Sequence, residues 1–129
     1  MKVVTLYAGL LALLFVVLSV RTLRMRRRLR IAIGDGSDQQ MLRAMRVHSN
    51  FAEYVPFSLL LLYLVEETGA SPAYMHALGA ALLIGRLLHA IGVSQVDEKY
   101  GFRIAGMALT FTVLIAAAAR LLHGYAVGR

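Results

Sequence analysis

An uncharged apolar run near the start of the chain most strongly constrains its fold. The residues from Val3 to Val20 carry no charged side chain. As an α-helix this run is about 27 Å long, close to the ~30 Å thickness of the bilayer hydrocarbon. A secretory signal peptide is the competing interpretation. Because the run lacks an obvious small-x-small cleavage site and an arginine block follows it, we expect an uncleaved membrane span.

Further apolar segments follow along the 129 residues, of which 59% are hydrophobic, against about 45–50% in a soluble domain. Turn and cap residues separate them at Gly34–Asp38 and at Ser71-Pro72. We predict one domain over residues 1–129, with helices at about 3–28, 39–67, 72–93 and 102–122. Short links between them make this an all-α integral membrane protein, a four-transmembrane-helix up-down bundle.

The basic residues indicate the topology. Eleven Lys and Arg side chains lie near the first and third connectors, and three lie at the opposite end of the bundle. The positive-inside rule therefore places these two connectors in the cytoplasm and both termini outside. A net charge of +7 could indicate nucleic-acid binding. Because the basic residues flank apolar spans, we exclude nucleic acid as a partner and assign the arginine block to topology and lipid-headgroup contact.

A polar cluster opens the second span, where such residues usually mark function. At 100° per residue, Asn50 lies about 40° from Arg46, and Glu53 about 20° from it on the other side. These three residues share one face and are called the polar stripe. His48 points nearly the opposite way and is expected to contact a neighbouring subunit. The stripe can hold a small zwitterionic ligand, or it can be a buried structural network.

Two other helices bring polar residues to the same depth. Arg86 and His89 lie on one side of the third span, and Arg103 lies in the first turn of the fourth. Three helices contributing polar groups at one depth favour a site. The alternatives are an Arg86 that pairs with Glu53 for structure, a His89 that only packs, and an Arg103 that anchors the helix at the interface. In the third span, Gly79 and Gly85 suit close helix packing.

The segment Arg46-Val-His48-Ser-Asn50-Phe-Ala-Glu53-Tyr54-Val-Pro56 resembles the signature of the MAPEG superfamily, the membrane-associated proteins of eicosanoid and glutathione metabolism. The resemblance covers nearly the whole chain, including the arginine block and the arginines late in span three and early in span four. The short length is similar to the bacterial members, which implies the inner (plasma) membrane. The family implies a homotrimer with a glutathione site between subunits, near the cytoplasmic leaflet.

The resemblance also implies roles for individual residues. The positions of Arg46, Asn50, Glu53 and Tyr54 contact glutathione in well-understood members, and the position of His48 is commonly Gln or His. Arg103 matches the arginine that activates the thiol in the leukotriene-synthesising member. That member has two tyrosines that help to hold glutathione. Here they are replaced by His89, which can still donate a hydrogen bond, and by Val93, which cannot; Arg86 is a further candidate contact.

The resemblance implies a glutathione-dependent transferase or peroxidase. Glutathione would be its co-substrate, and Arg103 would favour the thiolate of a thiol whose pKa is ordinarily ~8.5. The thiolate would attack a lipophilic electrophile or a hydroperoxide arriving from the bilayer. With no cysteine in the chain, a protein thiol nucleophile and a thiolate metal site are excluded, and we expect no metal. The alternatives are a non-catalytic lipid- or partner-binding trimer and, last, a drug/proton exchanger, whose first span would need a carboxylate.

Overall fold

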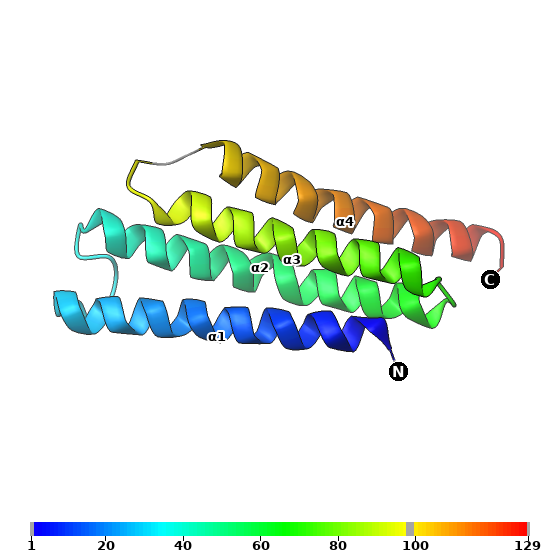
Figure 1. Cartoon of the computed structure of the whole chain (residues 1–129), viewed down its shortest axis with the longest axis horizontal. Helices are drawn as coiled ribbons and strands as arrows, with labels where there is room; N and C mark the ends of the chain where they lie inside the picture. The colour runs from blue at the N-terminus through cyan, green and yellow to red at the C-terminus, as the bar shows by residue number, and fades with distance from the viewer. Residues whose placement is uncertain (1, 98–99, 129) are drawn as a thin grey trace.

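The computed structural model describes residues 2–97 and 100–128, and within them the chain forms four α-helices. They are α1 (Val3–Leu29), α2 (Gln39–Glu67), α3 (Pro72–Ser94) and α4 (Tyr100–Ala126). The helices run up and down side by side (Figure 1), which confirms the all-α four-helix bundle. Both ends of the chain lie at one end of the bundle, and the α1–α2 and α3–α4 connectors lie at the other. Glu98 and Lys99 of the expected third connector, and Arg129, lie outside the described residues.

The helices begin where the cap residues predict. The Asp38 side chain accepts a hydrogen bond from the Met41 N–H at 2.8 Å and caps α2. The Ser71 side chain accepts one from the Tyr74 N–H at 3.3 Å, with Pro72 in the first turn of α3. Each cap satisfies a backbone donor that the first helical turn leaves without a partner. Sequence and structure therefore agree at both helix starts.

The N-terminus of α1 is capped from another helix. Its own N-cap residue, Lys2, provides no side-chain hydrogen bond. Instead, the carboxylate of Glu66 accepts hydrogen bonds from the backbone N–H groups of Val3 and Val4. A carboxylate at this position also interacts favourably with the positive end of the helix dipole. Glu66 therefore holds the start of α1 against the end of α2.

Among the described residues, α1, α3 and α4 are long and apolar enough to cross a membrane. Composition alone does not place α2 in this set, although the sequence predicts four spans. The 29-residue α2 packs against each of the other three helices and continues through Pro56. In its polar first half, Asn50 reaches α3, whereas Arg46 and Glu53 stay exposed.

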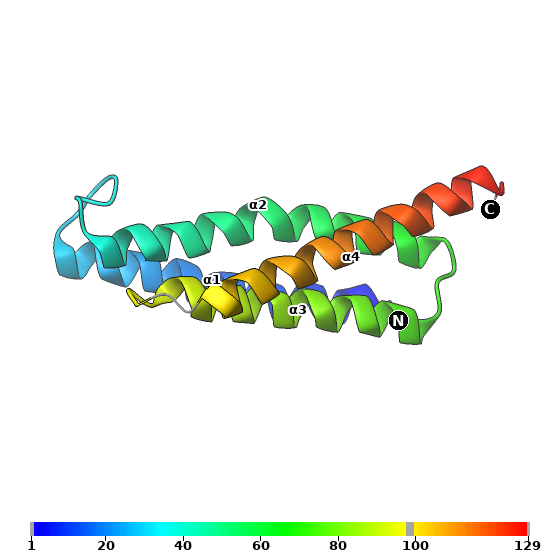
Figure 2. The same ribbon diagram turned by 90° about the horizontal axis from the view of Figure 1, so that it is seen from above.

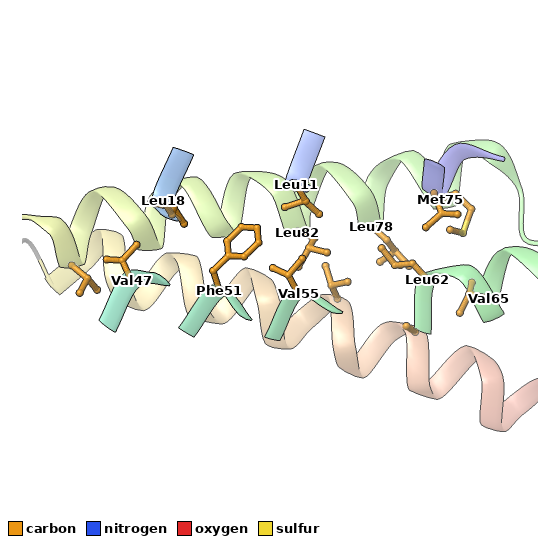
Figure 3. Packing of buried hydrophobic residues seen from close by; sticks show 14 residues of the cluster. Leu11, Leu18, Val47, Phe51, Val55, Leu62, Val65, Met75, Leu78 and Leu82 are labelled. Carbon is orange, nitrogen blue, oxygen red and sulfur yellow. The ribbon is translucent and has the colours of Figure 1, made fainter. Parts of the chain in front are cut away.

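The core lies between α1, α2 and α3 (Figure 3), with smaller contributions from α4. Each helix presents apolar residues to it at intervals of three, four or seven. The labelled members of the core are Leu11, Leu18, Val47, Phe51, Val55, Leu62, Val65, Met75, Leu78 and Leu82. The outward faces are also apolar, with Leu13 of α1 and Ile115 of α4 each more than two-thirds exposed. Such surfaces suit contact with lipid or with other protein chains.

Glycines allow α3 and α4 to approach closely where α4 crosses α3 obliquely (Figure 2). A Cβ atom added to Gly106 would lie 2.6 Å from both the Gly85 carbonyl oxygen and the His89 nitrogen. A Cβ atom on Gly79 would lie 2.2 Å from the ring of Tyr7 in α1. These contacts confirm that Gly79 and Gly85 serve close packing, and they add Gly106 as the partner on α4.

Candidate functional site

A buried arginine on α3 lies at the centre of the candidate site. Arg86 is 1% exposed, and its Nη1 donates a hydrogen bond to Oδ1 of Asn50 at 2.9 Å. Its Nη2 lies 3.6 Å from the sulfur of Met107 on α4. The guanidinium carbon lies 6.0 Å from the centroid of the Tyr54 ring, at the outer limit of a cation–π contact. Three helices therefore converge on one positive charge.

The partner of Arg86 differs from the one that the sequence indicates. Within the described part of the chain Arg86 has no ion pair with Glu53, whose side chain is exposed. Asn50 and Glu53 are 60° apart around α2, because three residues turn the helix by 300°. Asn50 therefore reaches α3 while Glu53 points outward. An amide oxygen accepts one hydrogen bond without neutralising the guanidinium, and Nε of Arg86 is buried without a hydrogen-bond partner in the described residues.

The polar stripe lies along the outer side of α2. Arg46 and Glu53 are exposed, and Asn50 between them is half-buried through its bond to Arg86. Seven residues separate the two charged members, which is about 10 Å along the helix axis. Tyr54 is half-buried, and its ring meets Phe111 of α4 edge-on with centroids 5.7 Å apart. The stripe thus has two accessible, opposite charges around a fixed amide.

The two candidate histidines lie elsewhere. Nε2 of His48 is 3.0 Å from Oγ of Ser19, and its ring stacks on Phe15 with centroids 4.9 Å apart. Both partners are on α1 of the same chain, so His48 points away from the stripe as expected. Its predicted contact with a neighbouring subunit stays a prediction. His89 is 5% exposed, and its backbone packs against Gly106 of α4. Neither residue is presented on the outer side of α2.

The structure places Arg103 in the first turn of α4, where its side chain is exposed. Its position depends on Gly92 of α3, a residue that the sequence analysis did not identify. A Cβ atom on Gly92 would lie 2.8 Å from the Arg103 nitrogen and 3.1 Å from Cβ of Phe102. Gly92 and Gly85 are seven residues apart on α3, and this spacing of small residues is the sequence signal that would have revealed the contact.

Arg43, at the start of the polar cluster of α2, was not among the predicted site residues. Its Nη1 donates to the carbonyl oxygen of Val93 at 3.3 Å, so a second arginine ties α2 to the end of α3. Val93 itself is buried, and it offers a side chain with no polar atom. In the part of the chain that the structure describes, Arg86 to Asn50 and Arg43 to Val93 both link α2 to α3.

Comparison with known proteins identifies relatives of the whole bundle. The family model described as "MAPEG family" matches residues 4–123. The inner membrane protein YecN of Escherichia coli strain K12 is 36% identical over 110 residues, which cover 85% of this chain and 82% of that protein. YecN of Escherichia coli O6:H1 matches with the same identity and coverage. The matched region includes all of the candidate site residues.

Proposed function

The chain belongs to the MAPEG family, and from this premise we propose that it is a membrane-bound, glutathione-dependent transferase or peroxidase. Its relatives are named as inner membrane proteins, which supports a bacterial inner membrane. The excess of basic residues near the first and third connectors supports our proposal that these connectors face the cytoplasm. We also propose that three chains assemble into a homotrimer, with one chain completing the glutathione site of its neighbour. The outward position of Arg46 and Glu53 on α2 supports such a shared site.

The observation that carries the proposal is the pair of opposite charges on the polar stripe. A fully extended tripeptide spans about 10 Å, which matches the axial distance between Arg46 and Glu53. Glutathione is a tripeptide with two carboxylates and one ammonium group. Arg46 would bind a carboxylate with its guanidinium fork, and Glu53 would accept hydrogen bonds from the ammonium.

The neighbours of the stripe would act through positioning. Arg86 holds the amide oxygen of Asn50 inward, which leaves the amide nitrogen to donate to a ligand. The ring of Phe111 fixes Tyr54, whose hydroxyl would add a further hydrogen bond. His48 would act by fixing α2 against α1, and His89 by filling the α3–α4 contact. Arg86, His48 and His89 are therefore positioning residues in this proposal.

Arg103 would supply the chemistry. A guanidinium beside the glutathione sulfur favours the thiolate, because an opposite charge lowers the pKa of the thiol. In conjugation, the thiolate forms a C–S bond to an electrophilic carbon. In a substitution, the bond from that carbon to the leaving group breaks and the leaving group departs with the electron pair. In an addition, the resulting carbanion takes up a proton. In peroxide reduction, the thiolate attacks one oxygen and the O–O bond breaks, giving an alcohol and a sulfenic acid. A second glutathione then converts the sulfenic acid to a disulfide and water.

A non-catalytic lipid- or partner-binding trimer is the second candidate. It is favoured by the contacts that Asn50, Tyr54 and Arg86 already make within one chain. Such internal contacts would be expected of a structural network that needs no ligand. The two candidates differ in whether substitution of Glu53 or Arg103 changes the binding and the reaction of glutathione.

Equilibrium binding of glutathione to the detergent-solubilised protein, together with conjugation kinetics, tests the proposal. Glu53→Gln should raise the Kd by about tenfold or more, because a hydrogen bond to a charged group contributes roughly 1.5–3 kcal/mol. Arg103→Ala should lower kcat with a smaller effect on Kd. Glu67→Gln removes an exposed carboxylate at the other end of α2 and is the matched control. No binding at millimolar glutathione would contradict the proposal and favour the non-catalytic trimer.

A further inference from the structure

The outer face of α1 has an apolar part and a cationic part on one line. Exposed residues at intervals of three, four and seven share a face about 60° wide on the helical wheel. They are Leu6, Leu10, Leu13, Val17, Arg24 and Arg28, and we call them the α1 outer stripe. Along this stripe, the residues up to and including Val17 are apolar, and those from Arg24 onward are basic. An amphiphile with an anionic head group is complementary to this stripe, because its apolar tail would meet the apolar part and its negative charge would meet the basic part.

A hollow of about 470 Å³ lies where the two parts meet. Its lining residues all belong to α1 and combine three valines, three arginines and a methionine: Val16, Val17, Val20, Arg21, Arg24, Met25 and Arg28. Arg21 is half-buried, and its Nη1 donates a hydrogen bond to Ser94 of α3, which fixes the guanidinium at the edge of the hollow. Nη2 of Arg28 donates a hydrogen bond to Oε1 of Gln40 at 3.2 Å. Two of the three arginines are thus oriented by neighbouring segments.

The arginine block divides into two groups with different contacts. Arg26 points to the α1–α2 connector, where it donates to the carbonyl oxygens of Gly34 at 3.0 Å and Ala32 at 3.4 Å. The three arginines of the hollow instead lie directly beyond the apolar part of the stripe. This division distinguishes a defined cationic site from a helix end that is merely basic.

We propose that this hollow binds one anionic phospholipid. The phosphate of the head group would contact Arg21, Arg24 and Arg28, since guanidinium forks match phosphate oxygens and basic residues near the membrane surface attract anionic lipids. An acyl chain would lie along Leu13 and Val17. From Leu10 to Val20 the helix rises about 15 Å, which equals the hydrocarbon depth of one leaflet. The hollow shares no residue with the polar stripe, so the lipid site does not depend on the proposed enzymatic function.

Native mass spectrometry of the detergent-purified protein, titrated with phosphatidylglycerol or with phosphatidylcholine of the same acyl chains, tests the site. Arg24→Gln/Arg28→Gln should raise the Kd for phosphatidylglycerol by on the order of tenfold or more. The matched control Arg27→Gln/Arg30→Gln removes the same charge from the same helix end and should change it less than about threefold. Val17→Trp/Val20→Trp fills the hollow, keeps every charge, and should also weaken binding.

Three results would overturn the lipid site. Equal losses in the two arginine double variants would mean diffuse charge attraction. Equally tight phosphatidylcholine would mean that the arginines do not recognise the head group. A change in the number of chains per particle in Arg24→Gln/Arg28→Gln would mean that a second copy covers this face. Circular dichroism checks that each variant keeps its helices. If a double variant loses them, the single variants Arg24→Gln and Arg27→Gln are compared in its place.

Discussion

The contributions of Arg86 and Asn50 to the free energy of unfolding should be strongly coupled, because the two side chains share a hydrogen bond. Arg86 is 1% exposed, and the Asn50 amide oxygen is its one hydrogen-bonded oxygen acceptor among the described residues. Asn50→Ala would leave a second guanidinium nitrogen without a partner, in addition to the buried Nε. A hydrogen bond to a charged group contributes about 1.5–3 kcal/mol, so we expect Asn50→Ala to lower the free energy of unfolding by about 2 kcal/mol.

Arg86→Met removes the charge and keeps a flexible, unbranched apolar side chain at this position. Without the guanidinium, the half-buried Asn50 can exchange its bond for water or for a detergent head group. Asn50→Ala should therefore cost much less in the Arg86→Met background than in the wild-type background. The coupling energy of the double-mutant cycle should be about 1.5–2 kcal/mol.

Unfolding in mixed micelles of increasing dodecyl sulfate content, followed by circular dichroism, measures all four corners of this cycle. If Asn50→Ala lowers the free energy of unfolding by the same amount, within about 0.5 kcal/mol, in the two backgrounds, the two sites are independent. The Arg86–Asn50 contact would then not hold α2 and α3 together, and the positioning role given to Arg86 would be wrong. Ser49→Ala, one residue from Asn50 on α2, controls for changes in the helix itself.

Two further changes probe the contacts between helices. Gly106→Ala should destabilise the bundle by about 1–3 kcal/mol, because the added Cβ would lie 2.6 Å from backbone atoms of Gly85 and His89, whereas Gly9→Ala, with nothing within 4 Å, should be neutral or stabilising in the same unfolding assay. Glu66→Gln should lower stability by about 0.5–2 kcal/mol through weaker capping of α1, while Glu67→Gln, which removes only an exposed ion pair with Lys2, should cost under about 1 kcal/mol; a larger loss in Glu67→Gln would reverse this assignment.

The apolar runs and cap residues were sufficient to predict the fold. Helix α2 begins after Asp38 and α3 after Ser71, as their capping side chains indicate. The poorest boundary is the end of α4, which was expected near residue 122 and lies at Ala126. Hydropathy falls at His123, but a helix continues as long as its backbone hydrogen bonds do, so apolar content underestimates its length.

The helical wheel predicted which residues of α2 share a face, but not which neighbouring helix that face meets. The choice of Asn50 over Glu53 as the partner of Arg86 depends on the rotation of α2 against α3, which a single sequence does not contain. The same holds for His48, whose opposite direction was correct and whose partner on α1, Ser19, was not foreseen. Gly92 and Gly106 act through the backbone contacts that they permit, and a glycine in an apolar run gives only a weak signal of this.

Ionisation of bound glutathione tests the central proposal most directly. Ultraviolet thiolate absorbance is recorded against pH for the detergent-solubilised protein with glutathione, and for the Arg103→Ala variant. Arg120→Ala, which removes an exposed arginine from the far end of the same helix, is the control. We predict a thiolate signal near pH 7 in the wild-type protein and in Arg120→Ala, and its loss in Arg103→Ala. A titration at the ordinary thiol pKa of ~8.5 in all three proteins would contradict thiol activation by Arg103.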